Sequence, residues 1–191
     1  MFSSAISRWT MLHFGAALVC FVLAQIIAVS GLAFPVASLF SPMTLAALHL
    51  VTVGWLTLLM LGALHQFLPV ITAQGRTAGH SALVALLAVL AGLGGMETGF
   101  LALDGRLPDA LLPALPIGGC LVLVGVGVAV FSFSRVLLHT RPLPFPARVR
   151  AAGLVFLRSA VALGITRGIA CASPGLLSWP DEPEDGLRLH L

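Results

Sequence analysis

Long apolar stretches separated by short polar ones dominate the pattern along this chain. The stretches lack the alternation of polar and apolar residues typical of membrane strands. Each is long enough to cross a hydrocarbon layer of about 30 Å at about 1.5 Å per residue. The pattern therefore predicts an all-α, polytopic transmembrane helical bundle that forms a single membrane domain. Five spans are expected, over residues 10–34, 43–69, 81–103, 110–138 and 149–177.

The fifth stretch is less regular than the others because it carries Arg158 and Arg167. These residues are nine positions apart and point to opposite faces of a helix, so no continuous apolar face is left for a surface helix. An arginine near the bilayer centre costs about 2.5 to 3.5 kcal/mol, which is tolerable beside other helices. We therefore expect a fifth span, followed by an outer loop and the start of a missing sixth span over residues 178–191.

Composition supports a membrane location. Hydrophobic residues make up 59% of the chain and charged residues only 9%, with a mean hydropathy of +1.06. This leaves too little polar surface to cover a soluble globule of this size, so the lipid bilayer is the expected main partner. The arginines are scattered singly and not gathered on one face, which argues against binding to nucleic acid.

The positions of the arginines predict the orientation, because cytoplasmic loops retain positive charge during insertion. A cytoplasmic N-terminus leaves only Arg106 and Arg188 outside. It places six arginines inside: Arg8, Arg76, Arg135, Arg141, Arg148 and Arg150. We therefore expect a multi-pass protein of the bacterial inner membrane with its N-terminus in the cytoplasm.

A short string occurs in two near-copies, Ala47-Leu48-His49-Leu50 and Arg188-Leu189-His190-Leu191, which share Leu-His-Leu. If both copies begin parallel helices, an odd number of spans must separate them, and three spans satisfy this condition. The repeat predicts an internally duplicated protein of which this chain is a fragment. Histidines at matching places, His49 and His190, are a plausible way to hold a haem or a metal between two halves of a bundle.

Three further side chains are candidates for chemistry. Glu97 is the only acidic residue within a span and lies at nearly the depth of His49, so it is expected to support a bound cofactor or to relay protons. The alternative is a protonated glutamate that is hydrogen-bonded within the bundle. His13 and His65 share one depth near the cytoplasmic end and could form a metal or haem pair. His49 and His65 are sixteen residues apart, about 160° around a regular helix, and should face different neighbours.

The run from Leu48 to Val70 resembles the second span of subunit I in the haem-copper oxidase and nitric oxide reductase superfamily. There, a histidine near the outer end of the span is an axial ligand to low-spin haem. A glycine-aromatic step, a second small residue and a closing proline follow it. The corresponding residues are His49, Gly54-Trp55, Gly62-Ala63 and Pro69. The resemblance implies that His49 binds haem b, with the second ligand from His190, from a missing helix or from another subunit.

This chain also departs from that superfamily, which uses a tyrosine and several histidines in later helices around an active-site copper. The sequence has no tyrosine and no later histidine pair within a span. No catalytic activity is expected from this chain alone, and copper is less expected than haem. Electron transfer, gas sensing or oxidase assembly is the implied role, with other membrane subunits or a second copy as partners. The competing hypotheses are a transporter or channel subunit, with Glu97 and glycine-rich helices lining a path, and a packing subunit without a ligand.

Overall fold

The computed structural model describes residues 7–71 and 79–138, with a few single positions between 153 and 166. The described part is helical and contains no strand, which confirms the predicted all-α class. Four helical segments are long and apolar enough to cross a membrane: Arg8–Val29, Pro42–Leu68, His80–Leu103 and Asp109–Arg135. The protein is therefore a multi-pass membrane protein. Most of the predicted fifth span, and residues 178–191 with His190, lie outside the described residues.

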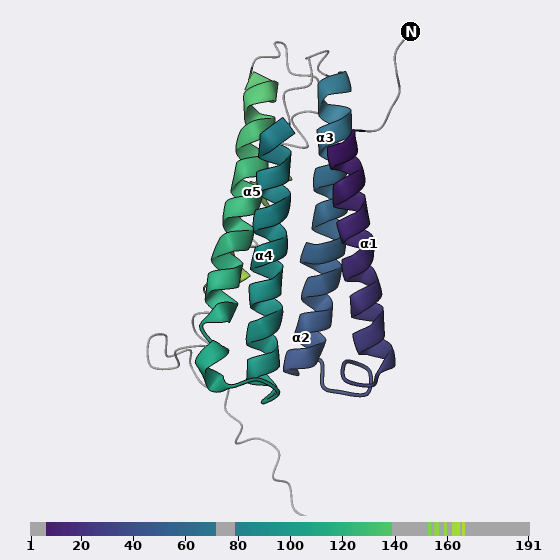
Figure 1. Cartoon of the computed structure of the whole chain (residues 1–191), viewed down its shortest axis with the longest axis vertical. Coiled ribbons are helices and arrows are strands. Elements are labelled where there is room, and N and C mark those ends of the chain that lie inside the picture. Colours follow the sequence, from purple (N-terminus) through teal and green to yellow (C-terminus); the bar gives the residue numbers. More distant parts are fainter. Residues whose placement is uncertain are drawn as a thin grey trace, which may run out of the picture.

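The four segments form two antiparallel hairpins (Figure 1). In the first, α1 lies beside a composite second span made of α2, η1 and α3. In the second, α4 lies beside α5, and the short 3-10 turn η2 precedes α5. The bounds are Arg8–Val29 for α1, Pro42–His49 for α2, Leu50–Thr57 for η1, Leu58–Ile71 for α3, Gly79–Leu103 for α4, Asp109–Leu111 for η2 and Ala114–Leu138 for α5.

The loop between α1 and α2 begins earlier than predicted and ends close to the predicted position. Helix α1 ends at Val29 and not at Phe34, because the chain turns at Gly31, whose φ of 75° favours glycine. Helix α2 begins at Pro42, where a missing N–H costs nothing in a first turn. The Ser41 hydroxyl accepts a hydrogen bond from the Thr44 backbone N–H at 3.3 Å and caps this helix.

The second span is not a regular α-helix. Its middle section, η1, is a π-helix, with a wider turn than an α-helix. Within it the Thr57 hydroxyl donates to the carbonyl of Thr52, five residues earlier, at 2.8 Å. Gly54 lies against α1 so closely that a Cβ at this position would be 2.6 Å from the Cβ of Cys20. The sequence pattern did not predict this section.

Glycines bring α4 and α5 together. A Cβ at Gly92 would lie 2.6 Å from the carbonyl oxygen of Gly118 and 2.6 Å from the backbone nitrogen of Val122. A Cβ at Gly99 would meet the Cβ of Leu115 at the same distance. Lipid supplies little hydrophobic drive for helix association, so close backbone contact of this kind is a main source of stability.

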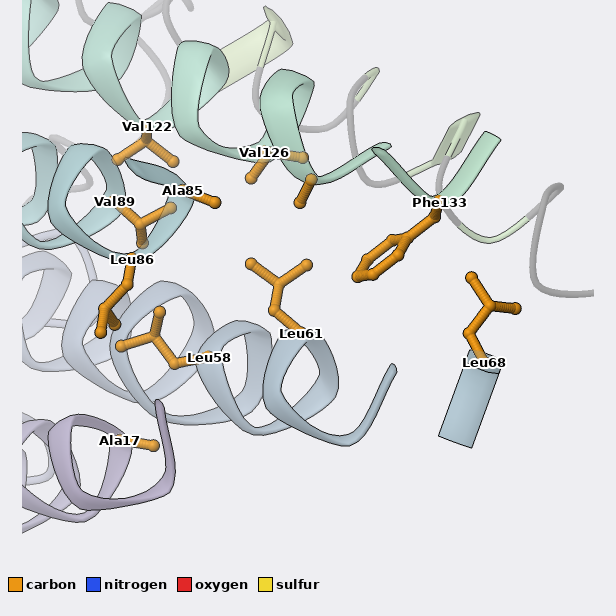
Figure 2. Close-up of a cluster of buried hydrophobic side chains, with 11 residues drawn as sticks. Ala17, Leu58, Leu61, Leu68, Ala85, Leu86, Val89, Val122, Val126 and Phe133 are labelled. Atoms are coloured by element: carbon orange, nitrogen blue, oxygen red, sulfur yellow. The ribbon is translucent and has the colours of Figure 1, made fainter. Parts of the chain in front are cut away.

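A buried apolar cluster joins the two hairpins (Figure 2). Leu58 and Leu61 of the second span meet Val89 of α4 and Val126 of α5 in it. Its full membership is Ala17, Leu58, Leu61, Leu68, Ala85, Leu86, Val89, Val122, Val126, Ala129 and Phe133. Outside this core, large apolar side chains face outward, as Leu18 does with 60% of its surface exposed. Such outward-facing residues suit contact with acyl chains.

Candidate functional site

His49 is the last residue of α2, directly before the π-helix. Its Nδ1 donates a hydrogen bond to the carbonyl oxygen of Leu45, 2.7 Å away. A carbonyl can only accept, so Nδ1 carries the proton and Nε2 of the neutral ring keeps its lone pair. The ring centre lies 5.0 Å from that of Phe100 on α4. His49 therefore faces protein, and its Nε2, the nitrogen that binds metals, is left available.

Glu97 lies on the same face of α4, three residues before Phe100. Leu93, one turn earlier on this face, packs with Cys20 and Leu50 in a small buried cluster. Glu97 is thus directed toward α1 and the second span. Its Oε1 is buried and has no hydrogen-bond partner. The hydrogen bond that orients His49 comes from the backbone of Leu45 and not from Glu97, so support of His49 by this carboxyl group stays a prediction.

His13 and His65 meet at the other end of the first hairpin. His13 of α1 has none of its surface exposed, and His65 of α3 has 6% exposed. Their ring centres are 5.4 Å apart and the ring planes are tilted by 52°. A Cβ at Gly62 would lie 2.8 Å from the Cβ of His13, so the absent side chain lets the helices approach here. His13 and His65 therefore share one depth, as the sequence predicts, and their rings also lie next to each other.

Most nitrogens of this histidine pair lack partners. Nδ1 of His13 donates to the carbonyl of Trp9 at 2.8 Å, whereas its Nε2 is buried without a partner. Both ring nitrogens of His65 are also buried and unpartnered, and its ring lies 4.7 Å from that of Phe133. The hydroxyl of Thr10, one turn from His13 on α1, is a fourth such atom.

The spacing of the pair does not fit a haem. Two axial bonds of about 2.0 Å in line, with about 1.1 Å from each nitrogen to its ring centre, place the ring centres about 6.2 Å apart. The observed separation of 5.4 Å is shorter. A haem held between His13 and His65 is thus disfavoured, whereas a single metal ion is not.

The other histidines do not join either group. His80 is exposed at the start of α4, and His139 and His190 lie outside the described residues. His49 and His65 have different neighbours, as expected, although the intervening π-helix changes the angle that a regular helix would give. Residues 7–71 and 79–138 contain no cluster of three or more His, Cys, Asp or Glu side chains that could hold a metal.

Sequence reasoning did not single out Thr10 or Phe100. Thr10 precedes His13 by three residues and Phe100 follows Glu97 by three, so each shares a helix face with a residue already singled out. This three-residue spacing could have identified both residues from the sequence.

No protein-family model matches the chain, and no curated protein sequence or solved structure matches it either. The oxidase resemblance therefore rests on residues 48–70 alone.

Proposed function

We propose that this chain is a haem-binding protein of the bacterial inner membrane, related to oxidase subunit I. It acts in electron transfer, gas sensing or oxidase assembly, with His49 as one axial ligand. The observation that carries the proposal is the hydrogen bond from Nδ1 of His49 to the carbonyl of Leu45. It fixes the tautomer whose free Nε2 is the atom that an axial ligand uses.

The surroundings of His49 suit this role. Its ring lies against Phe100 of α4, at one contact point between the two hairpins. The π-helix begins at the next residue, and π-helical turns occur frequently at functional sites. When bound, haem iron supplies reversible one-electron chemistry and a site for small gases.

Glu97 has a supporting part in this proposal. Its buried Oε1 has no partner, and its helix face is the one that carries Phe100. In an interior with a low dielectric constant, a change of charge at a cofactor favours uptake or release of a proton nearby. We assign Glu97 to hold that proton. The second axial ligand comes from His190, from a further helix or from a partner subunit.

A reduced-minus-oxidised absorption spectrum of the purified full chain tests the proposal. Wild type should show a haem b band, and His49→Ala should lose it. His80→Ala is the matched control, because His80 is an exposed histidine in the same bundle, and this variant should keep the band. Wild-type protein without any haem band, or a band unchanged in His49→Ala, would remove the proposal.

A transporter or channel subunit is the second candidate, favoured by the unpartnered Glu97 carboxyl group inside a span. Two observations weigh against it. Helix α4 is continuous through Gly94 and Gly95, whereas transporter sites often use broken helices. Gly92 and Gly99 are occupied by contacts with α5 and so do not line a path. Proton flux into proteoliposomes that Glu97→Gln abolishes would nevertheless favour this candidate over haem binding.

A further inference from the structure

The end of the first hairpin opposite His49 holds a concentration of unpaired polar atoms. Five buried side-chain nitrogen and oxygen atoms in the described part of the chain lack a hydrogen-bond partner. Four of them belong to Thr10, His13 and His65, and the fifth to Glu97. Because buried polar groups are nearly always satisfied, such a gathering needs a physical explanation.

The register of α1 against the second span brings the three side chains to one level. Gly54 packs on Cys20, and Gly62 packs on His13. Because the two helices are antiparallel, residues further along the second span lie level with residues nearer the start of α1. His65 follows Gly62 by three residues and Thr10 precedes His13 by three, so Thr10 is level with His65. The backbone N–H of Ser7 donates to Oε1 of Gln66 at 3.1 Å, which continues the same register.

We propose that His13 and His65 bind one copper(I) ion, with the Thr10 hydroxyl group beside it. This site is independent of the haem proposed at His49, which lies near the opposite end of the bundle. Imidazole nitrogens suit copper and zinc, and Nδ1 of His13 is already held by the Trp9 carbonyl, which leaves its Nε2 lone pair for an ion.

The ring separation fits one shared ion. With a metal–nitrogen bond of about 2.0 Å and about 1.1 Å from nitrogen to ring centre, each centre lies about 3.1 Å from the ion. Ring centres 5.4 Å apart then subtend about 120° at the ion. This is the angle of three-coordinate geometry, in which a third donor completes a plane. The hydroxyl oxygen of Thr10, buried and unpartnered, is the donor available at this level.

The charges around the pair favour a monovalent ion over a divalent one. The acidic residues in the described part are Glu97, Asp104 and Asp109, in the other half of α4 and in the loop that follows it. Both imidazoles and the hydroxyl are neutral donors, so no carboxylate among the described residues offsets the charge of the ion. The cost of burying an ion rises steeply with its charge, which makes copper(I) easier to hold here than zinc(II).

The full chain, purified in detergent and stripped of metal, tests the proposal. Copper(I) is titrated without oxygen against a coloured copper(I) chelator, and zinc(II) is titrated in parallel. Wild type should bind one copper(I) per chain and bind zinc(II) more weakly. X-ray absorption at the copper edge should show two imidazole ligands at about 2.0 Å.

Variants locate the ion. His65→Phe keeps a ring against Phe133 and removes both nitrogens, so it should fold and lose affinity by at least about tenfold, since outer-shell changes alone typically cost about 10- to 100-fold. His13→Ala should do the same. His49→Ala and His80→Ala should bind copper(I) as wild type does, and the helical circular dichroism signal checks folding of each variant.

Three results would overturn the proposal: no copper(I) bound by wild type, equal binding by folded His65→Phe, or a preference for zinc(II). The first would leave ordered water as the partner of these nitrogens. The second would mean adventitious binding elsewhere. Loss of haem in His49→Ala with intact copper binding, or the reverse, separates this proposal from the one for His49.

Discussion

Gly62 lies directly against His13, and this contact allows the two histidines to meet. A side chain at Gly62 would place its Cβ 2.8 Å from the Cβ of His13 and 3.0 Å from Cε1 of Phe14. His65 is three residues further along α3, on nearly the same face. The 5.4 Å separation of the imidazole centres thus depends on a missing side chain one turn away.

Substitution of Gly62 should separate α1 from α3. We expect Gly62→Val to destabilise the protein by about 1 to 3 kcal/mol, because the added atoms overlap His13 and the ring of Phe14. Copper(I) affinity should fall as well. Gly15→Val on α1 is the control, since a Cβ there meets no atom within 4 Å. The free energy of unfolding in mixed detergent measures both variants, and equal stabilities would contradict the packing described.

The α4–α5 interface offers a second comparison within one helix. Gly92→Val should cost about 1 to 3 kcal/mol, because its Cβ would lie 2.6 Å from two backbone atoms of α5, which cannot rotate away. Gly94→Val, two residues along the same helix, has open space and should be close to wild type. Resistance of the purified protein to detergent-induced unfolding gives the readout. A Gly92 variant as stable as the Gly94 variant would mean that the hairpin packs differently.

The sequence predicted the first four spans because an apolar run must be helical in lipid, where every backbone group needs an internal partner. It predicted the end of α1 poorly, because Gly31 turns a chain that stays apolar to Phe34. The π-helix escaped prediction, since angular estimates assume a regular helix throughout. Hydropathy also does not indicate that Gly54, within this π-helix, packs on Cys20 of α1.

The candidate sites were predictable in part. Their positions along the predicted spans put His13 and His65 at one depth near the same end of the bundle. Their contacts required the register of α1 on the second span, which depends on the glycines at 54 and 62. The partner of His49, the Leu45 carbonyl, follows from helix geometry and not from any motif.

Two replacements of Glu97 test its contribution to stability and its proposed role in holding a proton separately. The buried Oε1 makes no hydrogen bond, so Glu97→Met, of similar volume, loses no interaction through this atom and should unfold at an equal or higher detergent concentration. If Glu97 holds the proton that accompanies reduction, the midpoint potential of wild type changes with pH and that of Glu97→Gln does not. Potentiometric titration at several pH values measures this. A clear loss of stability in Glu97→Met would instead assign the carboxyl a packing role.

The two cysteines described in the structure should differ in reactivity. Cys120 on α5 is exposed, whereas Cys20 on α1 is buried against Gly54. In a Cys171→Ser background, a small maleimide added at alkaline pH to the protein in detergent should modify Cys120 and leave Cys20 largely unmodified, because only an exposed thiol meets the reagent and ionises to the reactive thiolate. Mass spectrometry of the labelled peptides gives the ratio. Equal labelling of both residues would contradict the inward position of Cys20.

The charges at the two ends of the bundle predict its orientation. In the loop after α4, Nε of Arg106 lies 2.6 Å from a carboxylate oxygen of Asp104, so the one arginine there is paired with an acidic neighbour. Arg8 and Arg135, at the opposite end, lie over the rings of Trp9 and Phe131. That end should stay in the cytoplasm, because positive charge resists translocation. Alkaline phosphatase fused after Arg106 should be active, and a fusion after Arg76 inactive. The reverse pattern would invert the topology.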